Sequence, residues 1–192
     1  EIAITMVSDS ATVEAVILGN DGVLAGLQPD SVVIDMSTIA PDTTRTLAEA
    51  VRRAGSAMLD APVSGGVAGA ASGSLSIMVG GEADVFQRCL PVLQVLGKTI
   101  ALIGPSGAGQ TAKLINQVIG MGTLAAVADG LRLAQAAKLD LNQLIEVVGA
   151  GAASSWQLLN TGRLMAAEDW RPGFRVALAL KDLRLALAEA EA

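Results

Sequence analysis

One lysine and two amide side chains interrupt an apolar stretch of the sequence. Lys113, Asn116 and Gln117 are spaced i, i+3 and i+4, so on a helix they share one face. They come after a glycine-rich segment, residues 104–110, which itself follows the apolar run 99–103. The pattern predicts a strand, a tight turn and a helix, with a ligand site where the backbone of the turn can be approached.

Several interpretations compete for this stretch. Residues 104–111 are close to a Walker A loop, but Gln110 occupies the position of the phosphate-binding lysine. Residues 107–112 imitate a dinucleotide-binding fingerprint, which needs a second strand where residues 114–138 have a helical pattern. A third interpretation is a helix whose Lys113 does chemistry, and a fourth is an ordinary solvated lysine. The local sequence leaves all four open.

Strand and helix patterns alternate in the first half of the chain. Apolar runs predict strands at 2–7 (buried), 31–36, 58–61, 75–79 and 99–103, with helices near 11–18, 41–54 and 82–96, the last kinked or broken at Pro91. This alternation is typical of an α/β domain with a largely parallel sheet. After Gly109 we expect helices alone, over 110–138, from the cap Asp140 with Gln143, and from near 154 and 174. The change in composition near residue 106 predicts two domains, 1–105 and 106–192.

Polar turns follow three of the predicted strands. They are residues 7–9, Ser37 with Thr38, and residues 60–66. Each is, taken alone, best explained as an ordinary helix cap or turn. Open α/β sheets bind ligands beyond the carboxyl ends of their strands, so three such turns together favour one shared cleft.

Composition excludes several classes of protein. The 192 residues carry a net charge of −6 without a Lys/Arg cluster, which argues against nucleic acid and anionic membranes as partners. The absence of histidine excludes Ser-His-Asp and Cys-His catalysis and histidine metal sites, and we expect no metal. Cys89 is expected to be a buried thiol in a reducing compartment. No signal peptide is visible, and the most apolar window, 114–128, is too short to span a bilayer, so we expect a cytoplasmic protein.

Two motifs together resemble one enzyme family. Residues 60–66, Asp-Ala-Pro-Val-Ser-Gly-Gly, followed by Gly69 and Gly73-x-Leu75, resemble the substrate motif of the β-hydroxyacid dehydrogenases. Gly107-x-Gly109-x-x-x-Lys113-x-x-Asn116 resembles their catalytic motif. Residues 5–8, Ser37-Thr38, and Pro172-Gly-Phe followed by Lys181-Asp-Leu resemble their cofactor-side segments. The resemblance covers essentially the whole chain. It implies part of a Rossmann-type α/β domain followed by an all-α domain built on a long inter-domain helix.

The resemblance also implies a role for each matching residue. The nicotinamide of NAD or NADP and its ribose would be lined by Val7, Ser8, Thr12 and Thr38, and Lys181 would close over the cofactor. The substrate carboxylate would be held by Ser64, Gly65 and Gly66. Lys113 would be the catalytic residue, with Asn116 and Gln117 beside the substrate.

The expected chemistry suits these residues. Interconverting an alcohol and an aldehyde needs a group that takes and returns the hydroxyl proton, and in a sequence without His or Tyr a lysine is the side chain suited to it. We therefore expect an NAD(P)-dependent oxidoreductase that interconverts a short 3-hydroxyacid and its semialdehyde, and a homo-oligomer (dimer or tetramer). The rival classes are a P-loop-like nucleotide-binding protein and a catalytically silent relative that serves as an interaction module.

Two features depart from the family pattern. Gln117 stands where several members have a second asparagine, which leans toward the tartronate semialdehyde reductase branch. The family's first βαβ unit, with its Gly-x-Gly-x-x-Gly turn, is not in the sequence, and the last helices look shortened, so we expect the sequence to be a fragment. The residue that selects NAD or NADP would lie in that first unit.

Overall fold

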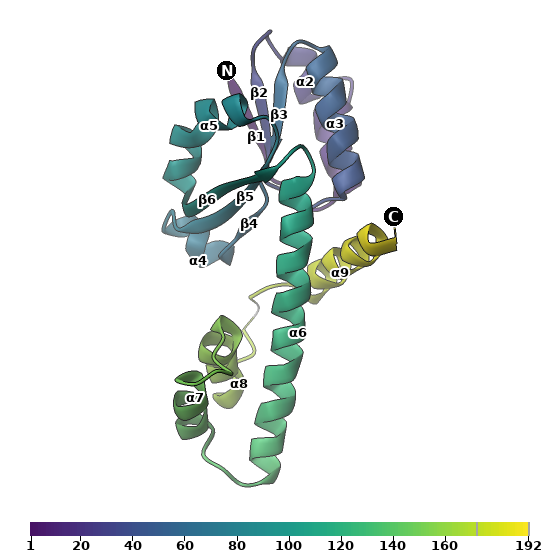
Figure 1. Cartoon of the computed structure of the whole chain (residues 1–192). Helices are drawn as coiled ribbons and strands as arrows, with labels where there is room; N and C mark the ends of the chain where they lie inside the picture. Colours follow the sequence, from purple (N-terminus) through teal and green to yellow (C-terminus); the bar gives the residue numbers. More distant parts are fainter. Residues whose placement is uncertain (172, 192) are drawn as a thin grey trace. The chain divides into compact units, whose positions relative to one another are not determined.

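The computed structural model describes residues 1–171 and 173–191 (Figure 1). Its first part alternates strands and helices, as the sequence predicts. The elements are β1 (Ile2–Thr5), α1 (Ser10–Leu18), α2 (Val23–Gly26), β2 (Val32–Asp35), α3 (Pro41–Arg53), β3 (Ala57–Asp60), β4 (Val63–Ser64), α4 (Gly66–Ala71), β5 (Leu75–Gly80), α5 (Ala83–Leu96) and β6 (Gly97–Gly104).

Helices follow from there on, again as predicted. They are α6 (Ala108–Ala136), α7 (Leu141–Gly149), the π-helical turn η1 (Gln157–Thr161), α8 (Gly162–Ala166) and α9 (Val176–Glu191). The Asp140 side chain caps α7 by accepting from the Gln143 N–H. Helix α5 runs through Pro91 as one element, so of the predicted kink or break at Pro91 the break is wrong. Pro172, which belongs to one of the resembling segments, lies outside the described residues.

The strands form one largely parallel sheet. Its order is β1-β2-β3-β5-β4, and β6 pairs with β5. The pairs β1–β2, β2–β3 and β5–β6 are parallel, whereas β5 runs antiparallel to β3 and β4. The parallel pairs bring the carboxyl ends of β1, β2 and β3 to one edge, where the predicted polar turns lie.

Helices cover both faces of this sheet (Figure 1). Strand β2 is buried on both sides, and its residues alternate between two cores. Val32 and Ile34 belong to a cluster with Phe86 of α5, while Val33 packs with Leu47 of α3. Cys89 is fully buried in the first cluster, so its prediction as a core thiol is confirmed. The two-faced core is that of a Rossmann-type domain.

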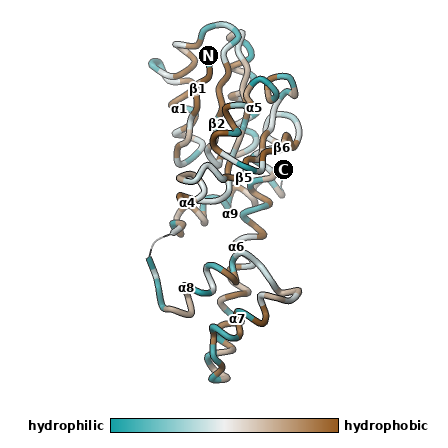
Figure 2. Tube along the Cα trace, turned by 90° about the vertical axis from the view of Figure 1, so that its left-hand side faces the viewer, coloured by the Kyte–Doolittle hydropathy of each residue, from teal (hydrophilic) through white to brown (hydrophobic). Residues whose placement is uncertain are grey.

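Strand β1 differs from the prediction of a buried strand. Ile2 and Ile4 are 41% and 45% exposed, although Figure 2 shows β1 as a hydrophobic stretch. Within residues 1–171 and 173–191 this strand pairs with β2 alone, so one of its edges is uncovered.

Two compact units divide the chain. One comprises residues Glu1–Ile115 together with α9, and the other comprises Asn116–Arg175, whose small core contains Leu131, Ile145 and Leu158. Helix α6 therefore contributes its first turns to one unit and the rest to the other. The domain boundary between residues 105 and 106 stays a prediction.

Helix α6 is longer than its most apolar window suggested. Among the described residues it is the one helix long and apolar enough to cross a membrane by length and composition, with 29 residues. The length argument against a span, which used residues 114–128, is therefore wrong. A single such helix is weak evidence for a span, since helices of soluble proteins pass the same test.

Candidate active site

The start of α6 is held against the sheet by Asp60, at the end of β3. One carboxylate oxygen, Oδ1, accepts from the Gly107 N–H at 2.9 Å, and Oδ2 accepts from the Gln110 N–H at 2.9 Å. Free amides at a helix start are matched here by a carboxylate, which also suits the helix dipole. Burial raises the pKa of Asp60, and the hydrogen bonds from Gly107 and Gln110 oppose this rise.

The glycines of this turn are required by its shape. Gly107 has φ +93°, a conformation that glycine adopts at little cost. A Cβ on Gly109 would lie 2.4 Å from the carbonyl oxygen of Met78, so only glycine lets the helix approach the sheet so closely. The turn therefore serves helix–sheet packing, and amides that a P-loop would offer to phosphate are bonded to Asp60 instead.

Lys113 lies one turn after Gln110 and is buried, with 8% of its surface exposed. The interpretation as an ordinary solvated lysine is therefore wrong. Burial lowers the pKa of Lys113, the negative charge of Asp182 raises it, and the positive charge of Lys181 lowers it. A buried amine of this kind gives up its proton more readily than a surface lysine, which suits a general acid and base.

Helix α9 brings a second lysine to the same unit. Lys181 donates a hydrogen bond to the carbonyl oxygen of Thr38, and its Nζ lies 3.1 Å from Oδ1 of the buried Asp182. The Lys181 side chain is 24% exposed. The resemblance places Lys181 over the cofactor, and the structure brings it to Thr38, one of the predicted cofactor-side residues.

Hydrogen bonds connect the turn after β2 to the end of β1 and the turn that follows it. The Val7 N–H donates to Ser37 Oγ at 2.9 Å, and Asp35 Oδ1 accepts from Thr5 Oγ1 at 2.9 Å and from the Ser37 N–H at 3.2 Å. The structure thus brings Val7 and Thr38 to one edge of the sheet. Backbone and hydroxyl groups at such an edge are what a nicotinamide and its ribose need.

Ser8 and Thr12 flank the start of α1. Their hydroxyls donate to Asp9 Oδ2 at 2.8 Å and to Asp9 Oδ1 at 2.7 Å, and Asp9 also accepts from the Thr12 N–H at 2.9 Å. These contacts are a helix cap, the ordinary explanation for the motif. They leave Ser8 exposed and Thr12 half-buried beside the predicted cofactor edge.

The predicted substrate motif forms a short strand and a glycine turn. Ser64 ends β4, opposite Ser76 of β5, and is half-buried. Gly65 and Gly66 follow with φ of +128° and +61°, and both are exposed. A glycine turn of this kind leaves backbone N–H groups accessible to an anion.

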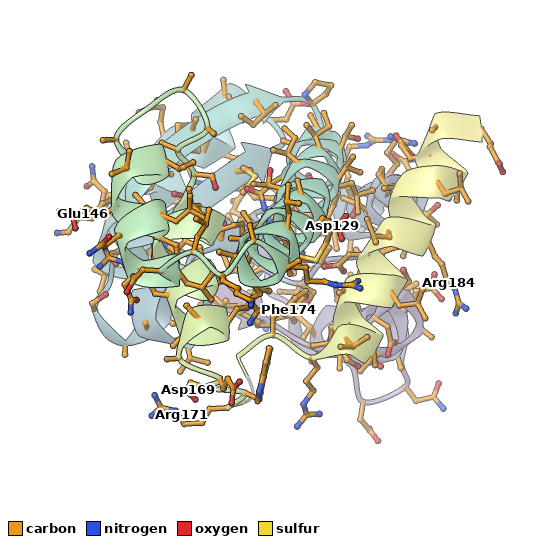
Figure 3. The ribbon with its side chains drawn as sticks, turned by 90° about the horizontal axis from the view of Figure 1, so that it is seen from below. Asp129, Glu146, Asp169, Arg171, Phe174 and Arg184 are labelled. Atoms are coloured by element: carbon orange, nitrogen blue, oxygen red, sulfur yellow. The ribbon has the colours of Figure 1, made fainter. Side chains whose placement is uncertain are left out.

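The remaining predicted residues continue α6. Asn116 and Gln117 follow Lys113 within about one helical turn, and Asn116 Nδ2 donates to Gln117 Oε1 at 2.8 Å. They belong to the second compact unit, as does the segment before α9 with Phe174 and the ion pair Asp169–Arg171 (Figure 3). Among the described residues, no group of three or more Cys, Asp or Glu side chains could hold a metal ion.

Three residues that shape this site are not revealed by the sequence alone. In the sequence Gln110 is a departure from the Walker A lysine, and Asp60 and Asp182 are parts of motifs. A carboxylate ending the apolar strand 57–60 was an available signal for Asp60. The contacts of Gln110 join distant segments, and Asp182 acts through its charge on Lys113 of a distant helix, so neither residue leaves a local pattern.

The fold and the site define a class: a Rossmann-type α/β protein with a buried lysine on the helix that leaves its sheet. Comparison with known proteins agrees. The model of the NAD binding domain of 6-phosphogluconate dehydrogenase matches residues 1–104, and the NAD-binding model of NADP-dependent 3-hydroxyisobutyrate dehydrogenase matches residues 107–192. The chain belongs to the β-hydroxyacid dehydrogenase family, as its motifs indicated.

Individual relatives are similar over the whole chain. It is 42% identical to the 2-hydroxy-3-oxopropionate reductase of Escherichia coli (strain K12), with all of this chain and 66% of the relative covered. It is 42% identical to the 3-hydroxyisobutyrate dehydrogenase of Pseudomonas aeruginosa, with 67% of the relative covered. The solved structure of Mycobacterium tuberculosis 3-hydroxyisobutyrate dehydrogenase with L-serine superposes with a TM-score of 0.88 at 33% identity, covering all of this chain and 68% of that one. The chain spans about two thirds of the length of the curated relatives it matches.

Proposed function

We propose that the protein is an NAD(P)-dependent oxidoreductase that interconverts a short 3-hydroxyacid and its semialdehyde, with Lys113 as general acid and base. The observation that carries the proposal is the burial of Lys113 at the start of α6, with its pKa lowered. A lysine in this state can take the hydroxyl proton of an alcohol and return it to the alkoxide that forms from an aldehyde. Its charged form also stabilises negative charge on the carbonyl oxygen.

The residues at the sheet edge fit a nicotinamide cofactor, whose role when bound is to accept or supply the hydride. Val7, Ser8, Thr12 and Thr38 would line its nicotinamide half, and Lys181 would cover it. The support is structural: the turns after β1 and β2 are bonded to each other, and Lys181 is bonded to Thr38.

The proposed substrate is a short acid whose carboxylate lies at Ser64, Gly65 and Gly66. The glycine turn supports this, and Asn116 and Gln117 would lie beside the same substrate. Three similar proteins bear names of this class: a 2-hydroxy-3-oxopropionate reductase, a 3-hydroxyisobutyrate dehydrogenase, and a dehydrogenase solved with L-serine. The proposal includes a cytoplasmic homo-oligomer that does not bind nucleic acid, in keeping with the net charge of −6.

The rival functions have less support. A P-loop nucleotide site lacks its lysine, and the amides of Gly107 and Gln110 are bonded to Asp60. A catalytically silent relative has no need of a buried lysine, and the burial of Lys113 costs free energy that the charge of Asp182 offsets only in part, since the net shift of its pKa is downward.

Calorimetry and steady-state assays test the proposal on the full-length protein. Titration with NADH, NADPH and Mg-ATP should show tight binding of one or both dinucleotides and none of Mg-ATP. Absorbance at the nicotinamide band should then report turnover with glycerate, 3-hydroxyisobutyrate, serine or the matching semialdehydes. Tight Mg-ATP binding without dinucleotide binding would contradict the proposal, and dinucleotide binding without turnover of any short hydroxyacid would refute the substrate class.

A further inference from the structure

The side chain of Gln110 connects the helix that carries Lys113 to the turn after β2. It is fully buried, and it lies one turn before Lys113 on α6. Its Oε1 accepts from the Ile39 N–H at 3.1 Å, and its Nε2 donates to the Ser37 carbonyl oxygen at 2.9 Å. Both polar ends of the amide are therefore used, on the two residues that flank Thr38.

The turn itself is held at each of its residues. Ser37 Oγ accepts from the Val7 N–H, the Thr38 carbonyl accepts from Lys181, and the Ile39 N–H donates to Gln110. The turn after β1 and the helices α6 and α9 thus contact three consecutive residues. Among these contacts, the one with Gln110 leads directly to Lys113 through a rigid helix.

Packing alone does not explain a glutamine here. A buried amide without partners is destabilising, and an apolar side chain of similar size would fill the same space at less cost. The two hydrogen bonds are therefore the property that distinguishes Gln110 from Leu or Met. They fix the direction as well as the distance of the turn relative to α6, because one end donates and the other accepts.

We infer that Gln110 is a positioning residue, which sets the place of the cofactor-side turn Ser37–Ile39 relative to the Lys113 amine. The inference rests on the proposed function, in which Thr38 lines the nicotinamide and Lys113 moves the proton. Gln110 touches neither group itself; it acts through the Thr38 backbone and through α6. Small errors in such a distance lower the rate of the chemical step more than they weaken substrate binding.

The variant Gln110→Glu tests the two hydrogen bonds separately from the packing of the side chain. A neutral glutamic acid can reproduce both contacts, with its carbonyl oxygen accepting from Ile39 and its O–H donating to Ser37. The carboxylate cannot donate, and it would place negative charge against the Ser37 carbonyl oxygen. Gln110→Met keeps the volume and removes both contacts at every pH. Gln87→Glu, on the exposed face of α5, introduces the same carboxylate without touching the turn.

The measurements are kcat, substrate KM and cofactor Kd for the full-length protein from about pH 5 to about pH 9. We expect Gln110→Glu to approach the parent at low pH and to lose kcat and cofactor affinity as pH rises, by about tenfold or more. Gln110→Met should show that loss throughout, and Gln87→Glu should follow the parent. Hydrogen exchange at the Ile39 amide, compared with the parent at each pH, should accelerate in Gln110→Met, which removes the acceptor of this amide. In Gln110→Glu it should accelerate only where repulsion between the carboxylate and the Ser37 carbonyl oxygen displaces the turn.

Different results would refute the proposed function and the inference about Gln110. A parent that neither binds dinucleotide nor turns over hydroxyacids refutes the proposed function. An active parent whose Gln110→Glu variant matches it at every pH refutes the inference alone. So does faster exchange at Ile39 without a change in kcat or cofactor Kd, since Gln110 would then be merely structural. If Gln110→Met does not fold, the pH series of Gln110→Glu decides, and a Gln110→Glu protein unfolded even at low pH also contradicts the inference.

Discussion

Lys181 donates a hydrogen bond to the carbonyl oxygen of Thr38, which precedes it by 143 residues. This bond joins α9, near the end of the chain, to the turn that follows β2. It places the positive charge of Lys181 beside Thr38, a residue that the proposed function assigns to the cofactor side, and close enough to Lys113 to affect its pKa. The cofactor side and the proton-transfer side of the proposed site therefore share one cluster of charges.

Replacing Lys181 with Met should weaken cofactor binding. The methionine keeps most of the apolar stem but loses the charge-assisted bond to Thr38 and leaves Asp182 without this partner. Bonds of this kind commonly contribute enough to change affinity by about 10-fold to 100-fold. Fluorescence titration with NADH and NADPH measures the effect, and Lys98→Met, at an exposed position of β6, is the matched control. Equal cofactor affinity in Lys181→Met and the parent would remove Lys181 from the site.

Replacing Ser64 with Ala should impair the use of substrate and spare the cofactor. The hydroxyl lies before a turn with two glycines at positive φ, where a carboxylate is expected. Loss of one hydrogen bond to a charged group costs about 1–3 kcal/mol, so kcat/KM should fall by about 5-fold to 150-fold. The exposed Ser74→Ala is the control. If kcat/KM for every short hydroxyacid is unchanged in Ser64→Ala, the carboxylate site lies elsewhere.

Replacing Asp60 with Asn should loosen the start of α6. The Gly107 and Gln110 N–H groups donate to different oxygens of Asp60, and the Asn NH2 group would replace one of these acceptors with a donor, so we expect a loss of about 1–3 kcal/mol in the free energy of unfolding at neutral pH. Chemical denaturation measures this loss. The exposed Asp84→Asn should change the free energy by less than about 0.5 kcal/mol.

The comparison of the parent with Asp60→Asn also predicts how the free energy of unfolding changes with pH. The pKa of Asp60 is raised in the folded state, so the folded state holds this proton more tightly than the unfolded state does. The stabilisation that comes from the proton is complete below the unfolded value of about 3.9 and is lost as pH rises through the folded pKa. The difference in the free energy of unfolding between the parent and Asp60→Asn should therefore decrease as pH rises in that interval. A difference that increases instead would show that the hydrogen bonds lower the pKa of Asp60 by more than burial raises it.

Local patterns predicted the elements of the fold well where those elements are long or buried. The run Val32–Asp35 gives a strand buried on both faces, and Asp140 caps α7. Short elements were missed: α2 with four residues, β4 with two, and the glycine-rich α4 with six. Too few residues form these elements for a periodicity to show. The exposure of β1 was also missed, because an apolar run predicts a strand but does not reveal how many neighbours it has.

The site was predictable only through its motifs. Lys113 alone is compatible with a surface lysine, and its burial depends on packing that no local pattern reports. In the sequence alone, Lys181 suggests an exposed lysine paired with a nearby acid, whereas its bond to Thr38 spans 143 residues. The family resemblance supplied those roles, whereas Gln110, whose bonds span 71 and 73 residues, required the structure.

Lys113 carries the central claim, and the pH dependence of its chemistry has a definite direction. Its pKa is lowered from the ordinary value of 10.5 by burial, so kcat should change with pH at values below 10.5. Alcohol oxidation needs the neutral amine, so kcat in that direction should fall as pH drops through the pKa. Aldehyde reduction needs the ammonium form, so kcat in that direction should fall as pH rises through it.

The most direct measurement is kcat of Lys113→Ala in both directions across this pH range, with cofactor Kd measured on the same samples. The account predicts a loss of roughly 10²–10⁴-fold in kcat, disappearance of both limbs, and nearly unchanged cofactor binding. Lys113→Arg should fail as well, because guanidinium keeps its proton at working pH, and Lys98→Ala should behave as the parent. A Lys113→Ala protein with near-parental kcat and the parental pH limbs would contradict the account, since proton transfer would then belong to another group.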